Sequence, residues 1–399
     1  MRLKGFATPS GRLMLTVITA GLVAAGTVAL SAGATAQLTP GQLAKLLGKA
    51  NWTYPAEFIN CKSASKNGCN STKKVSGFYK PLPVSQITKT WKICVSFPHL
   101  KDPYWLAVNY GAVQESKRDH VKMKLVEAGG YTNLPKQLDQ LDNCAAGGAN
   151  ALVIGAISYT GLDAKIAQLR RDGKVVIDVI NGISSPDVQA HALVSYYDMG
   201  FVAGKYLAKL SKTQAVSVGW FPGPPGAGWV ETSNQGFRDA IKGSKVKVLT
   251  TRYGDTGKDV QTSLVQDALN AFPQMNFVAG TAVTATAATT TLAARHLQNK
   301  VKVLADYIIP EVYDDIKAGK IACASNDQAV VQPRMAIDQA IRLLEHKPLY
   351  KNYGRVGPPV QLLCGPAAGK DNNLKKIFVH PSTFAPKNFK PEFSVNGGF

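Results

Sequence analysis

Residues 91–127 read WKICVSFPHLKDPYWLAVNYGAVQESKRDHVKMKLVE and predict a strand, a helix and a second strand. Lys92–Phe97 is a short apolar run that ends at a proline, which is typical of a strand in a covered sheet. Trp105–Arg118 has the periodicity of a helix, and Lys122–Glu127 is again a strand. This order of elements is the repeating unit of a parallel sheet with crossover helices.

The same alternation continues along the chain and then restarts, so two successive sets of β-α units are present. Further strands are predicted at 151–155, 175–179, 216–221, 246–252, 277–280, 301–305 and 360–364, with Cys323 on another. Further helices are predicted at 134–146, 161–172, 198–210, 229–241, 259–271 and 331–344, and an Ala/Thr-rich helix is expected to end at residue 296. We expect an α/β protein with two Rossmann-like lobes, whose parallel sheets are joined by a hinge.

The expected lobes are discontinuous in sequence. The N-terminal lobe is predicted at 91–195 plus 329–358, the C-terminal lobe at 196–328 plus 359–385, and a tail at 386–399. A cleft between two such lobes would close around a ligand by hinge motion.

The beginning of the chain is typical of a protein destined for export. Residues 1–36 combine a basic start, an apolar stretch at 13–30 and the small residues Ala34-Thr35-Ala36. This pattern predicts a cleavable signal peptide. The next segment, 37–90, has few periodic apolar positions, and we expect an irregular N-terminal extension.

The charge of the chain is strongly basic, with 46 Lys and Arg against 26 Asp and Glu and a formal net charge of +20. Such a balance can indicate nucleic-acid binding. Here the lysines are scattered and no nucleic-acid motif accompanies them, so we expect no nucleic-acid partner. A solvated basic surface with an affinity for anionic partners is the better interpretation.

All six cysteines follow the expected signal peptide. An even number in an oxidising compartment favours disulfides over metal or thiol chemistry. The sequence leaves fifteen pairings possible. The expected pairs are Cys61 with Cys69, Cys94 with Cys144, and Cys323 with Cys364. No C-x-x-C spacing or nearby histidine pair is present, so we expect no metal site.

The motifs of common enzyme classes are missing. The sequence has no H-E-x-x-H, no G-x-S-x-G and no G-x-x-x-x-G-K-S/T. The glycine-rich PGPPGAG at 222–228 lacks the G-x-G-x-x-G pattern, and we interpret it as a strand-to-helix turn at the rim of the cleft. We therefore expect a protein that is not an enzyme and has no cofactor. A cleft enzyme would need a nucleophile–base pair that the sequence does not nominate.

Aromatic residues follow several predicted strands, at the ends where open α/β sheets bind ligands. They are Tyr104 and Trp105 after the first strand, Tyr131 after the second, and Tyr196, Tyr197, Trp229 and Tyr307 farther along. Rings around a cavity attract a methylated nitrogen, and Asp102 would face its positive charge. Sugar binding is the alternative, for which Asn326 and Asp327 are the best candidates to bind hydroxyls. The predicted ligand-binding residues are Asp102, Tyr104, Trp105, Tyr131, Tyr196, Tyr307 and Asp327.

Five segments together carry a resemblance to a known family. They are WKICVSFPHLKDPYWLAVNYG at 91–111, KLVEAGGYTNLPKQLDQLDNC at 124–144, VSYYDMGFVAGKYL at 194–207, VAGTAVTATAA at 278–288 and ASNDQ at 324–328. The chain resembles the TorT family over roughly Trp91–Leu363. That family comprises periplasmic type I binding proteins that present trimethylamine N-oxide (TMAO) to a sensor histidine kinase.

The resemblance implies a function and assigns roles to residues. The family's ligand cage falls on Asp102, Tyr104, Trp105, Tyr131 and Tyr307, while Tyr196 stands where the family has a tryptophan. The implied protein is a periplasmic co-sensor that binds a methylated amine and acts on the periplasmic domain of a sensor histidine kinase. The alternative is a receptor that delivers a sugar or an amine to an ABC permease.

Overall fold

The computed structural model describes residues 38–59, 74–352, 354–377 and 379–399. All of them belong to one compact unit, Ala32–Phe399. The expected signal peptide and the expected pair Cys61–Cys69 lie outside the described residues. Among the described residues, no helix is both long and apolar enough to cross a membrane.

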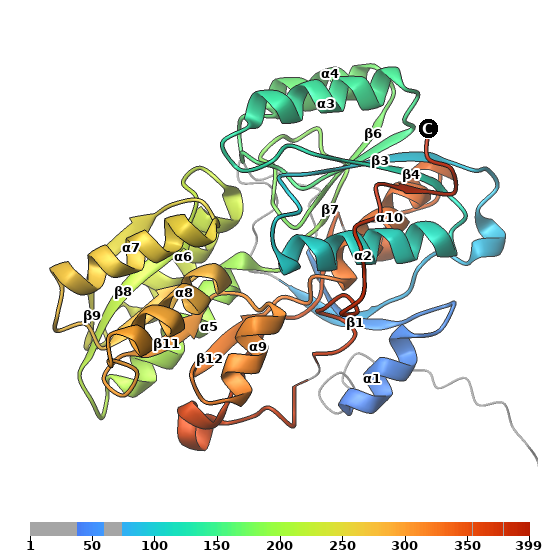
Figure 1. Ribbon diagram of the computed structural model, residues 1–399. Coiled ribbons are helices and arrows are strands. Elements are labelled where there is room, and N and C mark those ends of the chain that lie inside the picture. Colours follow the sequence, from blue (N-terminus) through green and yellow to red (C-terminus); the bar gives the residue numbers. More distant parts are fainter. Residues whose placement is uncertain (1–37, 60–73, 353, 378) are drawn as a thin grey trace, which may run out of the picture. The chain divides into compact units, whose positions relative to one another are not determined.

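Two sheets organise the described chain, and the larger has nine strands in the order β15-β4-β3-β5-β6-β7-β13-β1-β2 (Figure 1). Its strands are β1 (Tyr54–Ile59), β2 (Val75–Tyr79), β3 (Lys92–Phe97), β4 (Lys122–Glu127), β5 (Ala151–Ile154), β6 (Val175–Val179), β7 (Ala190–Ala192), β13 (Arg355–Gly357) and β15 (Ser394–Val395). From β4 to β13 the neighbours are parallel, whereas β1, β2 and β15 pair antiparallel.

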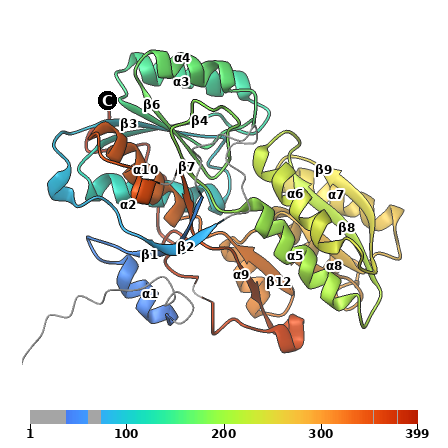
Figure 2. The same cartoon turned by 180° about the vertical axis from the view of Figure 1, so that it is seen from behind.

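Helices cover both faces of this sheet. They are α2 (Pro103–Arg118), α3 (Leu134–Ala146), α4 (Asp163–Arg171) and α10 (Val331–Leu344), with α1 (Pro40–Leu47) beside β1. Both views show α3 and α4 on one face and α2 and α10 on the other (Figures 1 and 2). Because both faces are covered, the central strands are apolar runs rather than alternating ones. All five residues of β6, for example, are buried.

The second sheet has six strands in the order β14-β12-β11-β10-β8-β9. Its strands are β8 (Val216–Gly223), β9 (Val246–Tyr253), β10 (Phe277–Gly280), β11 (Lys302–Ala305), β12 (Cys323–Asn326) and β14 (Gln361–Cys364). The associated helices are α5 (Tyr196–Leu210), α6 (Gly228–Ile241), α7 (Lys258–Ala271), α8 (Ala282–Ala294) and α9 (Pro310–Lys317). Only β14 runs antiparallel to its neighbour.

The chain changes sheet after β7, after β12, after β13 and again before β15. The division into two lobes with the predicted boundaries remains a prediction. The strand and helix predictions themselves are largely confirmed, since β3, β4, β6, β10, α3 and α10 begin and end at the predicted residues. Short elements were missed, namely β7, β13 and α9, because three- to eight-residue segments carry little periodicity.

The prediction that residues 37–90 are irregular is wrong for their described part. This segment forms α1, β1 and β2, and β1 pairs antiparallel with β13. Alternate residues of β1 (Tyr54, Ala56 and Phe58) are buried, which is the two-residue period of a strand. The expected tail is also docked, because Val395 of β15 pairs with Met123 of β4.

Two disulfides hold the described chain, and both are predicted pairs. Cys94–Cys144 joins β3 to α3, and its Cα atoms are 6.0 Å apart. Cys323–Cys364 joins residues directly opposite each other in β12 and β14, with Cα atoms 4.0 Å apart. Each disulfide therefore fixes neighbouring elements within one sheet region.

Candidate functional site

All seven predicted ligand-binding residues line one small cavity. The structure adds four further residues to the same lining, Ile180, Asn181, Trp229 and Thr256. Every one of these residues follows a strand of the first or the second sheet, or lies at the start of the next helix. The cavity has a volume of about 20 Å³, little more than the roughly 10–15 Å³ that one water molecule needs.

The N-terminus of α2 supplies one wall. Asp102 is the N-cap, and its carboxylate accepts a hydrogen bond from the Trp105 backbone N–H at 3.0 Å. Pro103 then occupies the first helical position, where its missing N–H is tolerated. This cap fixes Tyr104 and Trp105 in the first turn, beside the carboxylate. Burial raises the pKa of Asp102 to about 6, although hydrogen bonds from the Trp105 and Tyr104 backbones oppose this shift.

Contacts with neighbouring side chains hold the Trp105 ring in position. Its ring packs on Phe97, with centroids 4.9 Å apart, and against Tyr104 at 6.0 Å. Gly155 makes room for it, because a Cβ there would lie 2.7 Å from Cη2 of the indole. A glycine directly after β5 is therefore part of the site. Because Gly155 has no side chain, the indole of Trp105 can occupy this space.

Tyr131 completes this side of the cavity. Its hydroxyl accepts a hydrogen bond from the Asn181 side-chain amide at 2.9 Å. Asn181 also donates to the Ala156 carbonyl at 2.7 Å, which anchors the amide. The preceding residue, Ile180, has a φ of 61°, an unusual value for a β-branched side chain. Strained backbone of this kind tends to occur at functional sites.

The opposite wall comes from the second sheet. Tyr196 opens α5, Trp229 lies in the first turn of α6, and Tyr307 follows β11. The ring centroids of Trp229 lie 6.3 Å from Tyr196 and 6.1 Å from Tyr307. Tyr307 in turn lies 5.0 Å from Tyr104 of the first wall. The aromatic side chains thus form a continuous enclosure around the cavity.

The glycine-rich segment at 222–228 provides the seat for Trp229. Gly223 has a φ of +121°, and a Cβ on it would lie 2.6 Å from Cη2 of Trp229. The backbone conformation and the close approach both require glycine at this position. The prediction of a strand-to-helix turn is confirmed by β8 and α6. Trp229 was expected to face the cleft, but it was not among the predicted ligand-binding residues.

One hydrogen bond joins the two walls directly. The Tyr104 hydroxyl donates to Oδ2 of Asp327, which follows β12. Asp327 is fully buried, and burial raises the pKa of its carboxyl to about 6. Its second oxygen, Oδ1, has no hydrogen-bond partner among the described residues. The Tyr196 hydroxyl and the Trp229 indole N–H also lack a hydrogen bond of normal geometry, although they face the hydroxyls of Tyr104 and Tyr131. Buried polar atoms are normally paired, so a group of incompletely paired ones at one cavity is consistent with a ligand.

The arrangement suits a compact cationic or dipolar molecule. Six aromatic side chains surround the space, and their negative faces attract a methylated nitrogen. Asp102 and Asp327 add two carboxylates, which favour a positive charge. The Tyr196 hydroxyl and the Trp229 N–H remain as donors for an oxygen atom on the ligand. Among the described residues, no cluster of His, Cys, Asp and Glu has the composition to hold a metal ion.

The residues that sequence reasoning missed are mostly not aromatic. Asn181 follows β6 and Thr256 follows β9, so the strand-end criterion alone would have found both. Trp229 met that criterion and was recognised as a cleft-facing aromatic, yet was not among the predicted ligand-binding residues. Neither Asn326 nor Tyr197 lines the cavity.

Comparisons with known proteins identify the family to which this fold belongs. A family model described as the periplasmic binding protein domain matches residues 93–348. The periplasmic protein TorT of Escherichia coli K12 is 34% identical over 303 residues, which are 75% of this chain and 85% of TorT. These matches confirm the resemblance that the five sequence segments predicted.

Two solved structures are also similar. An ABC transporter solute binding protein from Bradyrhizobium sp. BTAi1, with bound bis-tris, is 48% identical with a TM-score of 0.66. It covers 85% of this chain and 98% of its own. TorT in complex with the TorS sensor domain and in the presence of TMAO is 28% identical with a TM-score of 0.66. That match covers 76% of this chain and 100% of the other.

Proposed function

We propose that this chain, which belongs to the periplasmic binding protein family, binds a small methylated amine of the TMAO type in the aromatic cavity. In this proposal the liganded protein then acts on the periplasmic domain of a sensor histidine kinase. Residues 1–36 would direct export and be removed. The proteins of this family bind ligands and are not enzymes.

The observation that carries the proposal is the composition of the cavity wall. The seven residues taken from the sequence come from segments up to 225 positions apart, yet all of them line one space. Aromatic faces contribute roughly 0.5–2 kcal/mol each toward a desolvated cation. A sugar would instead need a set of polar groups for its hydroxyls. Only Asn181 and Thr256 among the lining residues carry neutral, non-aromatic polar side chains.

The size of the cavity supports a ligand with few atoms. At about 20 Å³ the cavity holds little more than a water molecule, so its walls have to move apart for a trimethylated nitrogen and farther for a pyranose ring. The hydrogen bond between Tyr104 and Asp327 links the two walls and keeps the space enclosed. Closure around a small ligand is also the conformational change that a sensor partner would detect, because a ligand shifts an equilibrium only by its differential affinity.

Calorimetry of the purified protein against TMAO, tetramethylammonium, bis-tris and ribose tests the ligand class. We expect binding of the methylated compounds and no heat from ribose. Trp105→Phe replaces the indole by a smaller ring that attracts a cation less strongly. It should weaken TMAO binding about twofold or more, up to the roughly thirtyfold that a whole cation–π contact is worth. Trp220→Phe is the matched control, since Trp220 is equally buried but stacks on Phe237 at 4.1 Å outside the cavity. Ribose binding together with silence toward every amine would overturn the proposal.

A receptor for an ABC permease is the second candidate function. It is favoured by the 48% identity to an ABC transporter solute binding protein that holds bis-tris, which is a tertiary amine. The two candidates share the cavity and differ in the partner. We expect TMAO to change the affinity of this protein for the periplasmic domain of the sensor kinase encoded closest to its gene. An unchanged affinity, with amine uptake that depends on this protein, would favour the permease.

A further inference from the structure

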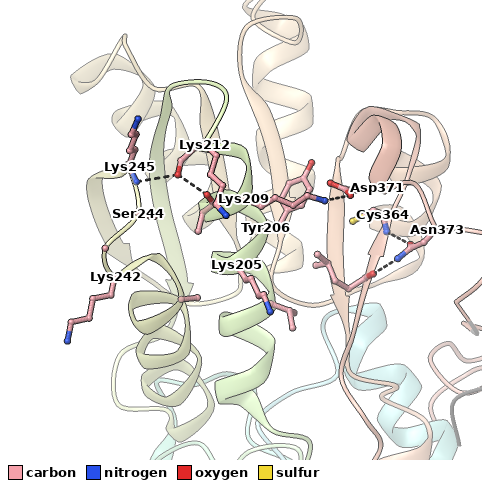
Figure 3. A pocket seen from close by; sticks show the side chains of 16 residues that line it. Lys205, Tyr206, Lys209, Lys212, Lys242, Ser244, Lys245, Cys364, Asp371 and Asn373 are labelled. Carbon is pink, nitrogen blue, oxygen red and sulfur yellow. Dashed lines mark hydrogen bonds and ion pairs between the residues drawn. The ribbon is translucent and has the colours of Figure 1, made fainter.

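A second cavity lies at the opposite end of the second sheet. It has a volume of about 730 Å³, within the range of small-molecule sites. Its walls are the second half of α5, the connection between α6 and β9, and β14 with the segment after it (Figure 3). The α5 segment precedes β8, the α6–β9 connection precedes β9, and β14 runs antiparallel to β12, so this cavity lies at the amino ends of the parallel strands. The aromatic cavity instead follows the carboxyl ends of β8, β11 and β12. The two cavities are therefore separate sites, and we call the second one the basic cavity.

The basic cavity carries a large excess of positive charge. Its lining includes five lysines, which are Lys205, Lys209, Lys212, Lys242 and Lys245, and a single acidic residue, Asp371. Only Lys209 has an ion-pair partner among the described residues, with its Nζ 2.5 Å from the Asp371 carboxylate. The negative ends of α5 and α6 contribute about half a charge each. Most of the positive charge is therefore not balanced by the protein.

Three of the lysines lie on the second half of α5 or directly after it. Lys205 and Lys209 lie four residues apart on α5, so their side chains lie above one another, and Lys212 lies in the turn just beyond the end of the helix at Leu210. Like charges at this spacing destabilise a helix unless a counter-charge is present. Lys242 and Lys245 belong to the facing connection, and their side chains extend outward from the rim (Figure 3). Lys205, Lys209 and Lys212 would contact an occupant, while Lys242 and Lys245 would attract it through their charge.

The rest of the wall is fixed and offers few acceptors. The Ser211 hydroxyl donates to the Ala208 carbonyl at 2.8 Å and accepts from the Lys245 backbone N–H at 3.3 Å. The Asn373 side chain is held by the backbones of Cys364 and Leu362 at 2.8 and 2.9 Å. The side-chain donors left for an occupant include the five lysine ammonium groups and the Tyr206 hydroxyl.

We propose that the basic cavity binds an anion that carries at least two phosphate groups. A phosphate ester has a charge of about −1.5 to −2 at neutral pH, so two groups match the uncompensated charge. Lysines bind phosphate as flexible point charges, which suits a cavity of this width. Paired phosphates occur in soluble oligophosphates and in the headgroup of cardiolipin. This proposal is independent of the ligand proposed for the aromatic cavity.

Titration calorimetry with tripolyphosphate, and cosedimentation with cardiolipin vesicles, test the proposal on the intact protein. We expect one saturable tripolyphosphate site, with affinity that falls as ionic strength rises from about 0.01 to about 0.15 M. Replacing Lys205 and Lys212 together by alanine should lower the affinity about tenfold or more, since each removes a charge-assisted hydrogen bond. Binding only to vesicles, lost in the same double variant, would assign the paired phosphates to the lipid.

The control separates a site from the general basic charge of the protein. Lys258 and Lys300 are also exposed lysines of the second-sheet region without an ion-pair partner among the described residues. Replacing both by alanine changes the net charge equally and should leave the affinity within about twofold. An equal loss in both double variants, or no binding by the wild-type protein to either probe, would overturn the proposal. TMAO binding, measured in parallel, should be the same in all variants.

Discussion

Asp327→Asn should make the protein more stable at pH 7 while weakening its ligand binding. The carboxyl is fully buried, and burial raises its pKa from 3.8 to about 6. Keeping it ionised at pH 7 therefore costs about 3 kcal/mol of folding free energy, at 1.36 kcal/mol per pKa unit. An asparagine has nearly the same shape and still accepts the hydrogen bond from Tyr104, but its uncharged amide also has to be desolvated. The expected gain is about 1–3 kcal/mol.

The pH dependence gives this prediction its sharpest test. The unfolded carboxyl releases its proton near 3.8 and the folded one near 6, so the folded state binds more protons between these values. Wild-type stability contributed by this group therefore falls as the pH rises from about 4 to about 6. The difference between Asp327→Asn and the wild type should accordingly be large at pH 7 and nearly vanish at pH 4. Urea unfolding at both pH values, followed by circular dichroism, measures it.

A matched control is available in another buried aspartate. Asp338 is also fully buried, but it accepts hydrogen bonds from Arg342 at 2.7 Å and from the Leu82 backbone at 2.6 Å. Asp338→Asn should destabilise by about 3–5 kcal/mol, because it leaves a buried arginine without its counter-ion. If Asp327→Asn is destabilising at pH 7, or has the same effect at pH 4, Asp327 does not carry a desolvation penalty. Unchanged affinity for TMAO would remove it from the ligand site.

Three further predictions concern the site and its frame. Affinity for tetramethylammonium, whose charge does not depend on pH, should fall at least about tenfold from pH 7 to pH 5, because the carboxyls of Asp102 and Asp327 both have a pKa of about 6 and attract the cation only when ionised. In calorimetry, Asp102→Asn should reduce this dependence, and adding Asp327→Asn should remove what remains. Gly155→Ala should displace the Trp105 ring, lowering stability by about 1–3 kcal/mol and reducing TMAO affinity, as tryptophan fluorescence and calorimetry would report. Replacing Cys323 and Cys364 by serine should lower the free energy of unfolding by up to about 4 kcal/mol, because the disulfide closes a loop with a sequence separation of 41. A change below about 1 kcal/mol in urea unfolding would contradict this account.

Local pattern was sufficient for most of the β-α framework. Apolar runs such as Lys92–Phe97 and Val175–Val179 predicted their strands to the residue, because a strand covered on both faces needs apolar side chains throughout. The same reasoning failed for residues 37–90. Tyr54–Ile59 is a strand that pairs with Val75–Tyr79 on one side and, on the other, with Arg355–Gly357, nearly 300 residues later in the chain. The three-residue strand Arg355–Gly357 carries no periodicity of its own, whereas the short alternation in Tyr54–Ile59 was overlooked among the polar residues around it.

The sequence by itself determined which side chains could form the site. Asp102, Tyr104, Trp105, Tyr131 and Tyr307 all follow strands, and the carboxyl ends of parallel strands share one edge of a sheet. Which of them meet was decided only by the tertiary structure. The bond from Tyr104 to Asp327 spans 223 positions and joins segments of two different sheets, so its formation depends on how the sheets approach each other. No local pattern encodes that approach, because it results from the packing of the whole chain.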